Sequence, residues 1–140
     1  MKRITVLAFL TAALISMASA RAHAQAPAFT VPFDFIVGNQ VFPAATYQVS
    51  YNATKTAILV RSKDDRFHAL TTTHLADPST SDNVVVFTKY GNQYFLHKVL
   101  CGAVSMNVEI PVSRLEKQAR IQDAQLPHSE TVAALRIGAH

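Results

Sequence analysis

The chain has 140 residues, of which 49% are hydrophobic and 16% charged, with a formal net charge of +4. This length fits one domain of common size. The single cysteine, Cys101, excludes an internal disulfide, and the scattered Lys and Arg residues form no basic run, which argues against a nucleic-acid-binding protein.

Residues 1–24 have the pattern of a cleavable secretory signal peptide. A short basic start precedes an uncharged, mostly apolar run over residues 4–17, and residues 22–24 match the A-x-A cleavage pattern. Residues 18–20 and 24–26 match that pattern as well. Because the apolar run is shorter than the ~20 residues that span a bilayer, cleavage is favoured over a retained membrane helix. We therefore expect no transmembrane segment after processing.

Cleavage after Ala24 would leave a domain over residues 25–125 and a tail over residues 126–140. Three basic residues would leave with the signal peptide, so ten basic residues would face nine acidic ones and the net charge would fall to about +1. A lipid-anchored form is excluded because no Cys stands at the cleavage point. The expected location is the periplasm or the outside of the cell.

Alternating apolar and polar residues predict β-strands through the first half of the domain. Apolar residues alternate along residues 29–37 and give this strand one aromatic face. Pro32 cannot donate a ladder hydrogen bond, which indicates either the start of the strand or a position at the edge of a sheet. A turn follows at residues 38–40. Residues 46–51 alternate again, and residues 56–60 form the next β-prone run.

The second half of the domain contains the clearest local signal. Residues 67–75 read as one long, Thr-rich strand, and residues 77–83 have the composition of a loop. The dipeptide Gly91-Asn92 lies between the β-prone runs 84–90 and 93–100. Such a dipeptide is typical of a two-residue hairpin turn, with a positive φ at the glycine.

The turn implies a register for this hairpin. Pairing Tyr90 with Gln93 sets Phe87 opposite Leu96 and Val86 opposite His97. One face would then carry Val84, Val86, Phe95, Val99 and Cys101, and the other Val85, Phe87, Tyr94, Leu96 and Leu100. Two apolar faces favour a hairpin in the middle of a sandwich, in a barrel under a helix, or at an interface.

A helix is predicted after a further strand over residues 104–110. Ser113 and Glu116 have the spacing of a capping box, which predicts a helix from Arg114 to about Asp123. Its apolar face is thin and consists of Leu115, Ala119 and Ile121. The tail could be a short helix capped by Ser129, a segment that binds a partner, or disordered, and we expect it to be weakly ordered.

These elements together predict a mainly β fold. We expect an antiparallel sandwich or a small barrel of six to eight strands, with one helix near the C-terminus.

Three histidines are the polar candidates for chemistry. His68 and His74 would share one face of one strand, but six residues of strand span about 20 Å, too far for two ligands of one metal. His97 could lie near one of them. We therefore expect no metal and no cofactor. The adjacent Asp64 and Asp65 read as a solvated turn rather than an acid/base pair.

Cys101 has two readings. It ends an apolar run and is therefore expected to be buried as a small hydrophobic residue. In the alternative it serves as a thiol for intermolecular pairing. A catalytic thiol is disfavoured, because four residues of strand put His97 about 13 Å away.

Four blocks of the chain resemble a known group of proteins. Residues 31–38, 42–47, 87–96 and 110–117 are together similar to an uncharacterised family of small exported proteins common in acidobacterial genomes. That family usually has Pro-Ala-Gly-Thr-Tyr in the second block, whereas Ala45 stands here at the Gly position. The resemblance implies export and a β-rich domain, and it implies no activity and no site residue.

The functional expectation is a non-catalytic exported protein of the cell envelope that binds a partner protein or forms an assembly, such as a homo-oligomer. The first alternative is a barrel that binds a small apolar ligand. The second is an enzyme, which is disfavoured because the sequence shows no nucleophile elbow, no Gly-rich phosphate loop and no Cys-x-x-Cys motif.

Overall fold

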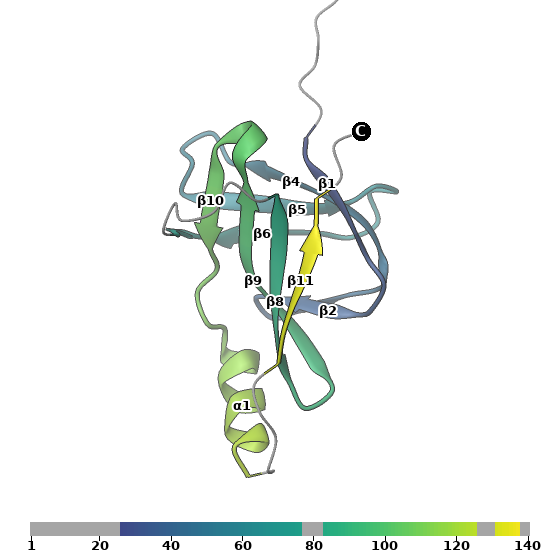
Figure 1. The fold of residues 1–140 in the computed structure, drawn as a ribbon, viewed down its shortest axis with the longest axis vertical. Helices are drawn as coiled ribbons and strands as arrows, with labels where there is room; N and C mark the ends of the chain where they lie inside the picture. Colours follow the sequence, from purple (N-terminus) through teal and green to yellow (C-terminus); the bar gives the residue numbers. More distant parts are fainter. Residues whose placement is uncertain (1–25, 77–82, 126–130, 138–140) are drawn as a thin grey trace, which may run out of the picture.

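The computed structural model describes residues 26–76, 83–125 and 131–137. These residues form eleven β-strands in two sheets, one short 3-10 helix and one α-helix (Figure 1). The prediction of a mainly β fold with one helix near the C-terminus is confirmed. The number of strands exceeds the expected six to eight because two predicted strands are each divided between the sheets, and because residues 40–42 and 131–136 form two further strands.

The first sheet has four antiparallel strands. They are β1 (Ala28–Val31), β4 (Ala45–Tyr51), β5 (Ala57–Ser62) and β6 (His68–Thr72), in the order β1-β4-β5-β6. Ala45 opens β4 without a positive φ, so this position does not need the glycine that the resembled family carries.

The second sheet has seven strands. Its main path runs through β11 (Thr131–Arg136), β8 (Val84–Tyr90), β9 (Gln93–Cys101), β10 (Met106–Glu109) and β7 (His74–Leu75). All neighbours on this path are antiparallel.

Two short strands extend the second sheet beside β9. β2 (Phe35–Val37) pairs in parallel with β9 through Ile36 and Phe95, and β3 (Gln40–Phe42) pairs with β2. All three residues of β2 are buried, because its two faces pack on different clusters.

The chain changes sheet twice where the sequence predicted continuous strands. The predicted strand 29–37 divides into β1 and β2 around Pro32, which has no N–H for a ladder hydrogen bond. The predicted strand 67–75 divides into β6 and β7 at Thr73, whose N–H still donates to Thr56 O at 3.1 Å. Both single-strand predictions were wrong, because local alternation does not reveal a change of sheet.

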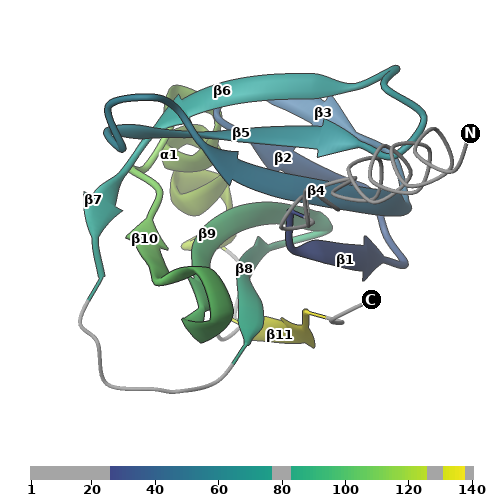
Figure 2. The ribbon, with the colours of Figure 1, turned by 90° about the horizontal axis from the view of Figure 1, so that it is seen from above.

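The two sheets curl around a shared core and meet along both sides (Figure 2). On one side β1 contacts β11, and on the other the chain passes directly from β6 into β7. The result lies between the predicted sandwich and the predicted barrel.

Aromatic rings fill the core between the sheets. The Phe35 ring contacts Tyr47 at 5.0 Å and Phe87 at 5.3 Å, both edge to face, and stacks on Phe42 at 5.5 Å. These rings come from both sheets, and each is at most 1% exposed. Such ring pairs contribute roughly 0.5–1.5 kcal/mol each beyond their buried area.

The β8–β9 hairpin turns where the sequence predicted. Gly91 has φ +58, Tyr90 pairs with Gln93, and Phe87 pairs with Leu96. The predicted turn and the first part of the register are therefore confirmed.

Beyond Phe87 the predicted register is wrong. A bulge lies between Val86 and Phe87, so Val86 pairs with Lys98 and the ladder skips His97. The extra residue reverses the alternation of side chains along β9. The buried residues that this hairpin contributes to the core between the sheets are Val85, Phe87, Leu96, Val99 and Cys101.

The helix α1 (Arg114–Asp123) spans the predicted range and follows the 3-10 helix η1 (Gly102–Val104) and β10 in the chain. The Ser113 hydroxyl accepts a hydrogen bond from the N–H of Glu116 at 3.1 Å, as expected for an N-cap. Ala119 packs on Ile36 and Phe95, on the outer face of the second sheet.

Two details of α1 differ from or add to the prediction. Ile121 was expected on the apolar face but is 65% exposed. At the end of the helix, the buried Asp123 accepts a hydrogen bond from the N–H of Gly91 at 2.9 Å, which ties the helix to the hairpin turn.

The tail was expected to be weakly ordered, but part of it forms β11. Residues 131–136 pair with β8 along their whole length, and Ile137 N–H donates to Asn83 O at 2.8 Å. Residues 1–25, 77–82, 126–130 and 138–140 lie outside the described residues, and these include the predicted signal peptide and most of the predicted loop. Within the described ranges, no helix has the length and apolarity needed to cross a membrane.

The cap at Ser113 yields the first prediction. Ser113→Ala should lower the free energy of unfolding by about 1 kcal/mol, because the Glu116 N–H loses its acceptor. Ser113→Asn keeps a side-chain acceptor and should cost clearly less. Urea unfolding of both variants measures the difference, and equal losses would show that the cap hydrogen bond is unimportant.

Candidate functional site

The three candidate histidines do not converge. His68 lies on β6 opposite Arg61, whereas His74 lies on β7 opposite Glu109, so the two are in different sheets. The prediction that they share a strand and a face was therefore wrong, because the chain changes sheet at Thr73. Across the described ranges, no group of three or more His, Cys, Asp or Glu residues is placed to hold a metal ion.

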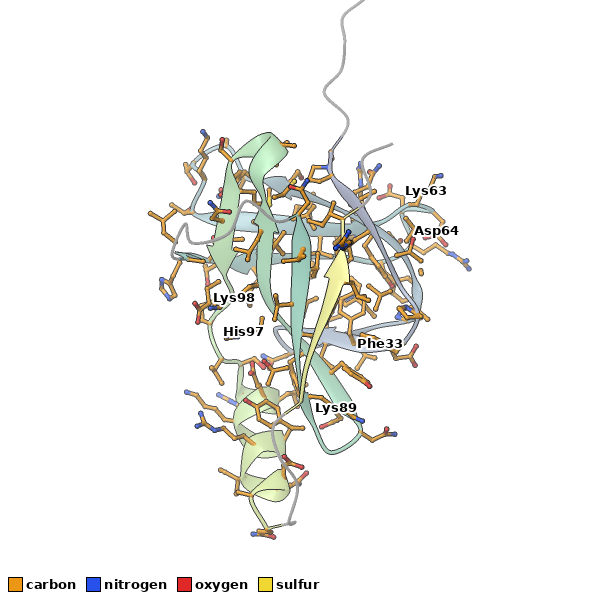
Figure 3. All side chains as sticks on the ribbon, viewed as in Figure 1. Phe33, Lys63, Asp64, Lys89, His97 and Lys98 are labelled. Atoms are coloured by element: carbon orange, nitrogen blue, oxygen red, sulfur yellow. The ribbon has the colours of Figure 1, made fainter. Side chains whose placement is uncertain are left out.

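Glu109 is the point where polar side chains of the second sheet meet. It lies between His74 on β7 and Lys98 on β9 in the sheet register. The Lys98 Nζ is 3.5 Å from Glu109 Oε2, and the His97 Nε2 is 3.6 Å from Glu109 Oε1. His97 and Lys98 are labelled in Figure 3. The bulge at His97 explains how two consecutive residues of one strand reach the same carboxylate.

This arrangement is a partly exposed ion pair. The side chains of Lys98 and Glu109 are 36% and 40% exposed, so water and salt screen their attraction. His97 Nδ1 is buried and has no hydrogen-bond partner among the described residues, whereas Nε2 of the same ring lies near Glu109. The site therefore consists of one carboxylate, Glu109, with His97 and Lys98 as its basic neighbours.

Cys101 lies inside the core. Its side chain is 2% exposed, and it pairs across the ladder with Met106, which is equally buried. The burial reading is confirmed. The alternative, a thiol for intermolecular pairing, disagrees with this burial, because the sulfur would have to leave the core to reach another molecule.

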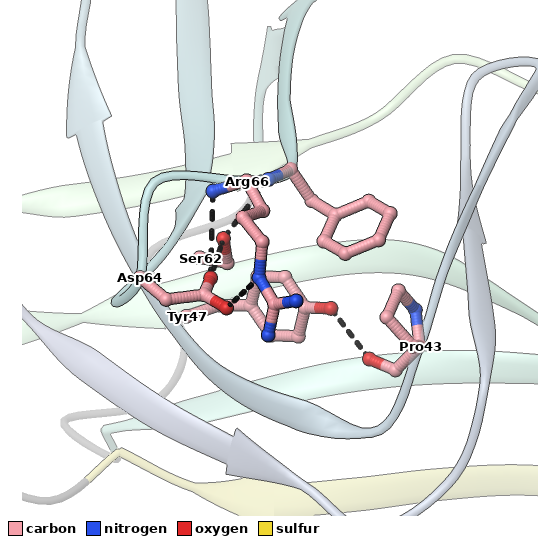
Figure 4. A network of polar contacts seen from close by, with 6 residues as sticks. Pro43, Tyr47, Ser62, Asp64 and Arg66 are labelled. Atoms are coloured by element: carbon pink, nitrogen blue, oxygen red, sulfur yellow. Dashed lines mark hydrogen bonds and ion pairs between the residues drawn. The ribbon is translucent and has the colours of Figure 1, made fainter.

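The Asp64–Asp65 turn is a structural network (Figure 4). The Ser62 hydroxyl donates to Asp64 Oδ1 at 2.6 Å, and Arg66 Nε donates to Asp64 Oδ2 at 2.5 Å. The hydrogen bonds from Ser62 and Arg66 lower the pKa of Asp64 to about 2. Asp65 has φ +60 and contacts Arg61 at 3.7 Å, so the two carboxylates have separate partners, as expected for a turn.

Tyr47 closes the loop between β3 and β4. Its ring is fully buried, and its hydroxyl donates to Pro43 O at 2.5 Å (Figure 4). Burial raises the pKa of Tyr47 to about 12, and the nearby carboxylates of Asp64 and Asp34 add to the shift. At neutral pH the phenol is therefore a fixed donor rather than a proton carrier.

A second aromatic group lies at the rim of the core near the hairpin turn. The half-buried Phe33 stacks on Tyr94 at 4.0 Å and meets Phe87 edge to face at 5.3 Å. Lys89 Nζ lies 5.3 Å from the centre of the Tyr94 ring, within cation–π range (Figure 3). This rim extends the aromatic core to the surface.

The ring packing bears on the apolar-ligand alternative. Phe35 contacts rings from both sheets at 5.0–5.5 Å, which is ordinary ring contact. A ligand between the sheets would have to displace these rings.

The surface feature that the sequence did not reveal is the open edge of β6. β6 pairs with β5 on one side and is the last strand of its sheet. Leu70, in the middle of β6, is 66% exposed, and Leu75, on the following β7, is 89% exposed. The only sequence signal was two leucines in a Thr-rich run predicted as a strand.

The raised pKa of Tyr47 generates a pH prediction. The protonated phenol is favoured in the folded state, so this contribution to stability is full below pH 10 and is lost as the pH rises toward 12. At pH 7, Tyr47→Phe should destabilise by about 1 kcal/mol through the lost hydrogen bond. Between pH 10 and 12 the difference from wild type should shrink. Urea unfolding at several pH values tests this, and a constant difference would contradict it.

The burial of Cys101 generates a labelling prediction. A thiol reagent should modify Cys101 at least roughly a hundredfold more slowly under native conditions than in denaturant, because the reaction requires opening of the core. The thiol introduced by Ile121→Cys, on the exposed face of α1, is the internal control and should react at once. Equal native rates at the two positions would contradict the burial.

Comparisons with protein-family models, with curated proteins and with solved structures gave no match to this chain.

Proposed function

We propose that this protein is an exported, non-catalytic component of the cell envelope that acts through binding or assembly. The observation that carries the proposal is the open edge of β6 with its exposed Leu70, next to the exposed Leu75. Exposed leucines beside unpaired backbone groups suit contact with another polypeptide.

The polar side chains support a binding role because they are engaged in hydrogen bonds and ion pairs within the domain. Asp64 is held by Ser62 and Arg66, Tyr47 by Pro43 O, and Glu109 by its two basic neighbours. Each of these contacts holds strands or turns together. An enzyme needs a nucleophile, acid or base that converges with others on a substrate.

Export is supported by the pattern of residues 1–24, with its basic start, apolar run and A-x-A site. The β-rich domain agrees with what the family resemblance implies. A periplasmic or secreted location would expose the open edge to other exported proteins.

The proposal is tested with the full chain expressed in its own host. The intact mass from the envelope fraction should correspond to a chain beginning at Gln25. A mass beginning at Met1 in the cytoplasm would refute export. A co-purifying small molecule, lost on denaturation, would favour the ligand-binding alternative instead.

The binding role is tested in the same cells by a photo-crosslinking residue at position 70 or at position 121. Position 121 is the matched control, because Ile121 is 65% exposed and Leu70 is 66% exposed. Adducts with polypeptide should form from position 70 and be rare from position 121. Equal yields at the two positions would refute binding through the β6 edge.

A further inference from the structure

The backbone of β6 has a definite set of unpaired groups. Flanking the β5–β6 ladder, Ser62 N–H donates to Phe67 O at 2.8 Å, and Thr73 N–H donates to Thr56 O at 3.1 Å. In an antiparallel ladder such hydrogen-bonded positions alternate along the strand. The odd-numbered residues of β6 therefore point their N–H and C=O toward β5, and His68, Leu70 and Thr72 point theirs away from it.

Among the described residues, no strand pairs with these outward groups. Thr72 O accepts only a long hydrogen bond, 3.4 Å, from the neighbouring hydroxyl of Thr71. In Figure 2, β6 lies at the margin of its sheet. An edge of this kind is a template for another strand.

β6 also lacks the features that usually protect an edge. It contains no proline, no glycine, no Lys and no acidic residue, and its pairing with β5 has no bulge. The other margins differ, since β1 and β11 contact each other, β7 has two residues and β3 has three.

We propose that the β6 edge is a self-association interface, in which two copies of this chain pair β6 with β6 in antiparallel orientation around a twofold axis at Leu70. The pairing would join the two four-stranded sheets into one continuous sheet. This inference deepens the proposed binding role, on which it rests, by naming a second copy of the chain as the partner.

The backbone supports this register. With Leu70 opposite the partner's Leu70, His68 lies opposite the partner's Thr72, so every outward N–H meets an outward C=O. A shift by one residue would set outward groups against groups already bonded to β5. A shift by two residues would keep the pattern but leave an outward residue of each copy unpaired.

The side chains support the same register. Leu70 lies directly opposite Leu59 of β5 on the outer face of the sheet. The twofold axis would extend this pair into a row of four leucines and cover side chains that are exposed in one copy. No like charges oppose each other, because His68 faces a threonine.

Cysteine cross-linking of the purified full chain tests the axis. Directly opposite Cα atoms in a hydrogen-bonded antiparallel pair are about 5.5 Å apart, within the range of a disulfide. Leu70→Cys should therefore give a covalent dimer on mild oxidation. Ile121→Cys, at matched exposure, and the wild type with its buried Cys101 should not.

Mixing variants tests the register. A mixture of His68→Cys and Thr72→Cys, distinguished by a mass tag, should give mainly mixed dimers, and each variant alone should give few. Cross-linking of His68→Cys alone as readily as in the mixture would overturn the register. A Leu70→Cys yield no higher than that of Ile121→Cys would overturn the interface.

Association without cross-links is the independent measurement. Leu70→Lys sets two ammonium groups against each other across the axis and should weaken dimerisation at least about tenfold in sedimentation equilibrium, whereas Ile121→Lys should not. Both sites are exposed, and circular dichroism verifies folding. Equal association of Leu70→Lys and wild type, or a monomer at all concentrations, would overturn self-association. The proposed binding role would still stand if position 70 cross-links to a different envelope protein.

Discussion

The contact of Phe35 with rings from both sheets is the interaction on which the rest of the structure depends. β2 brings Phe35 from the second sheet against Tyr47 of the first, and Phe87 of β8 completes the contact. With one cysteine and no internal disulfide, the domain depends on such burial for its stability. These rings occupy the space between the sheets around Phe35.

Two of the three changes of sheet along the chain, at Pro32 and at Thr73, bear on which strand edges are covered. At Pro32 the chain leaves β1, which contacts β11, and at Thr73 it leaves β6 to form the short β7. One side of the core is closed by the contact of β1 with β11, and the other by the passage of the chain from β6 into β7. After Thr73 the chain forms β7 in the second sheet and adds no strand beside β6. The outer edge of β6 therefore has no strand paired with it among the described residues, and Leu70 is exposed. The open edge is thus a consequence of how the core is enclosed.

The bulge at His97 links the core with the polar surface. One additional residue in β9 directs Val99 and Cys101 into the core, and it lets His97 and Lys98 reach Glu109 together. The same displacement that buries the thiol therefore gathers the polar cluster. The partners of Glu109 follow from strand geometry, which is why their presence is not in itself a sign of catalysis.

Local sequence by itself determined the strand-rich character, the Gly91 turn and the helix that begins after Ser113, because these depend on alternation, a positive φ and a cap formed by neighbouring residues. Only the tertiary structure decided the division at Thr73, the bulge at His97, β11 as a strand, and the open edge of β6. Each depends on pairing between segments distant in the chain. A shift of one residue in that pairing reverses the face of every following side chain. The alternation of residues within one segment does not reveal such a shift.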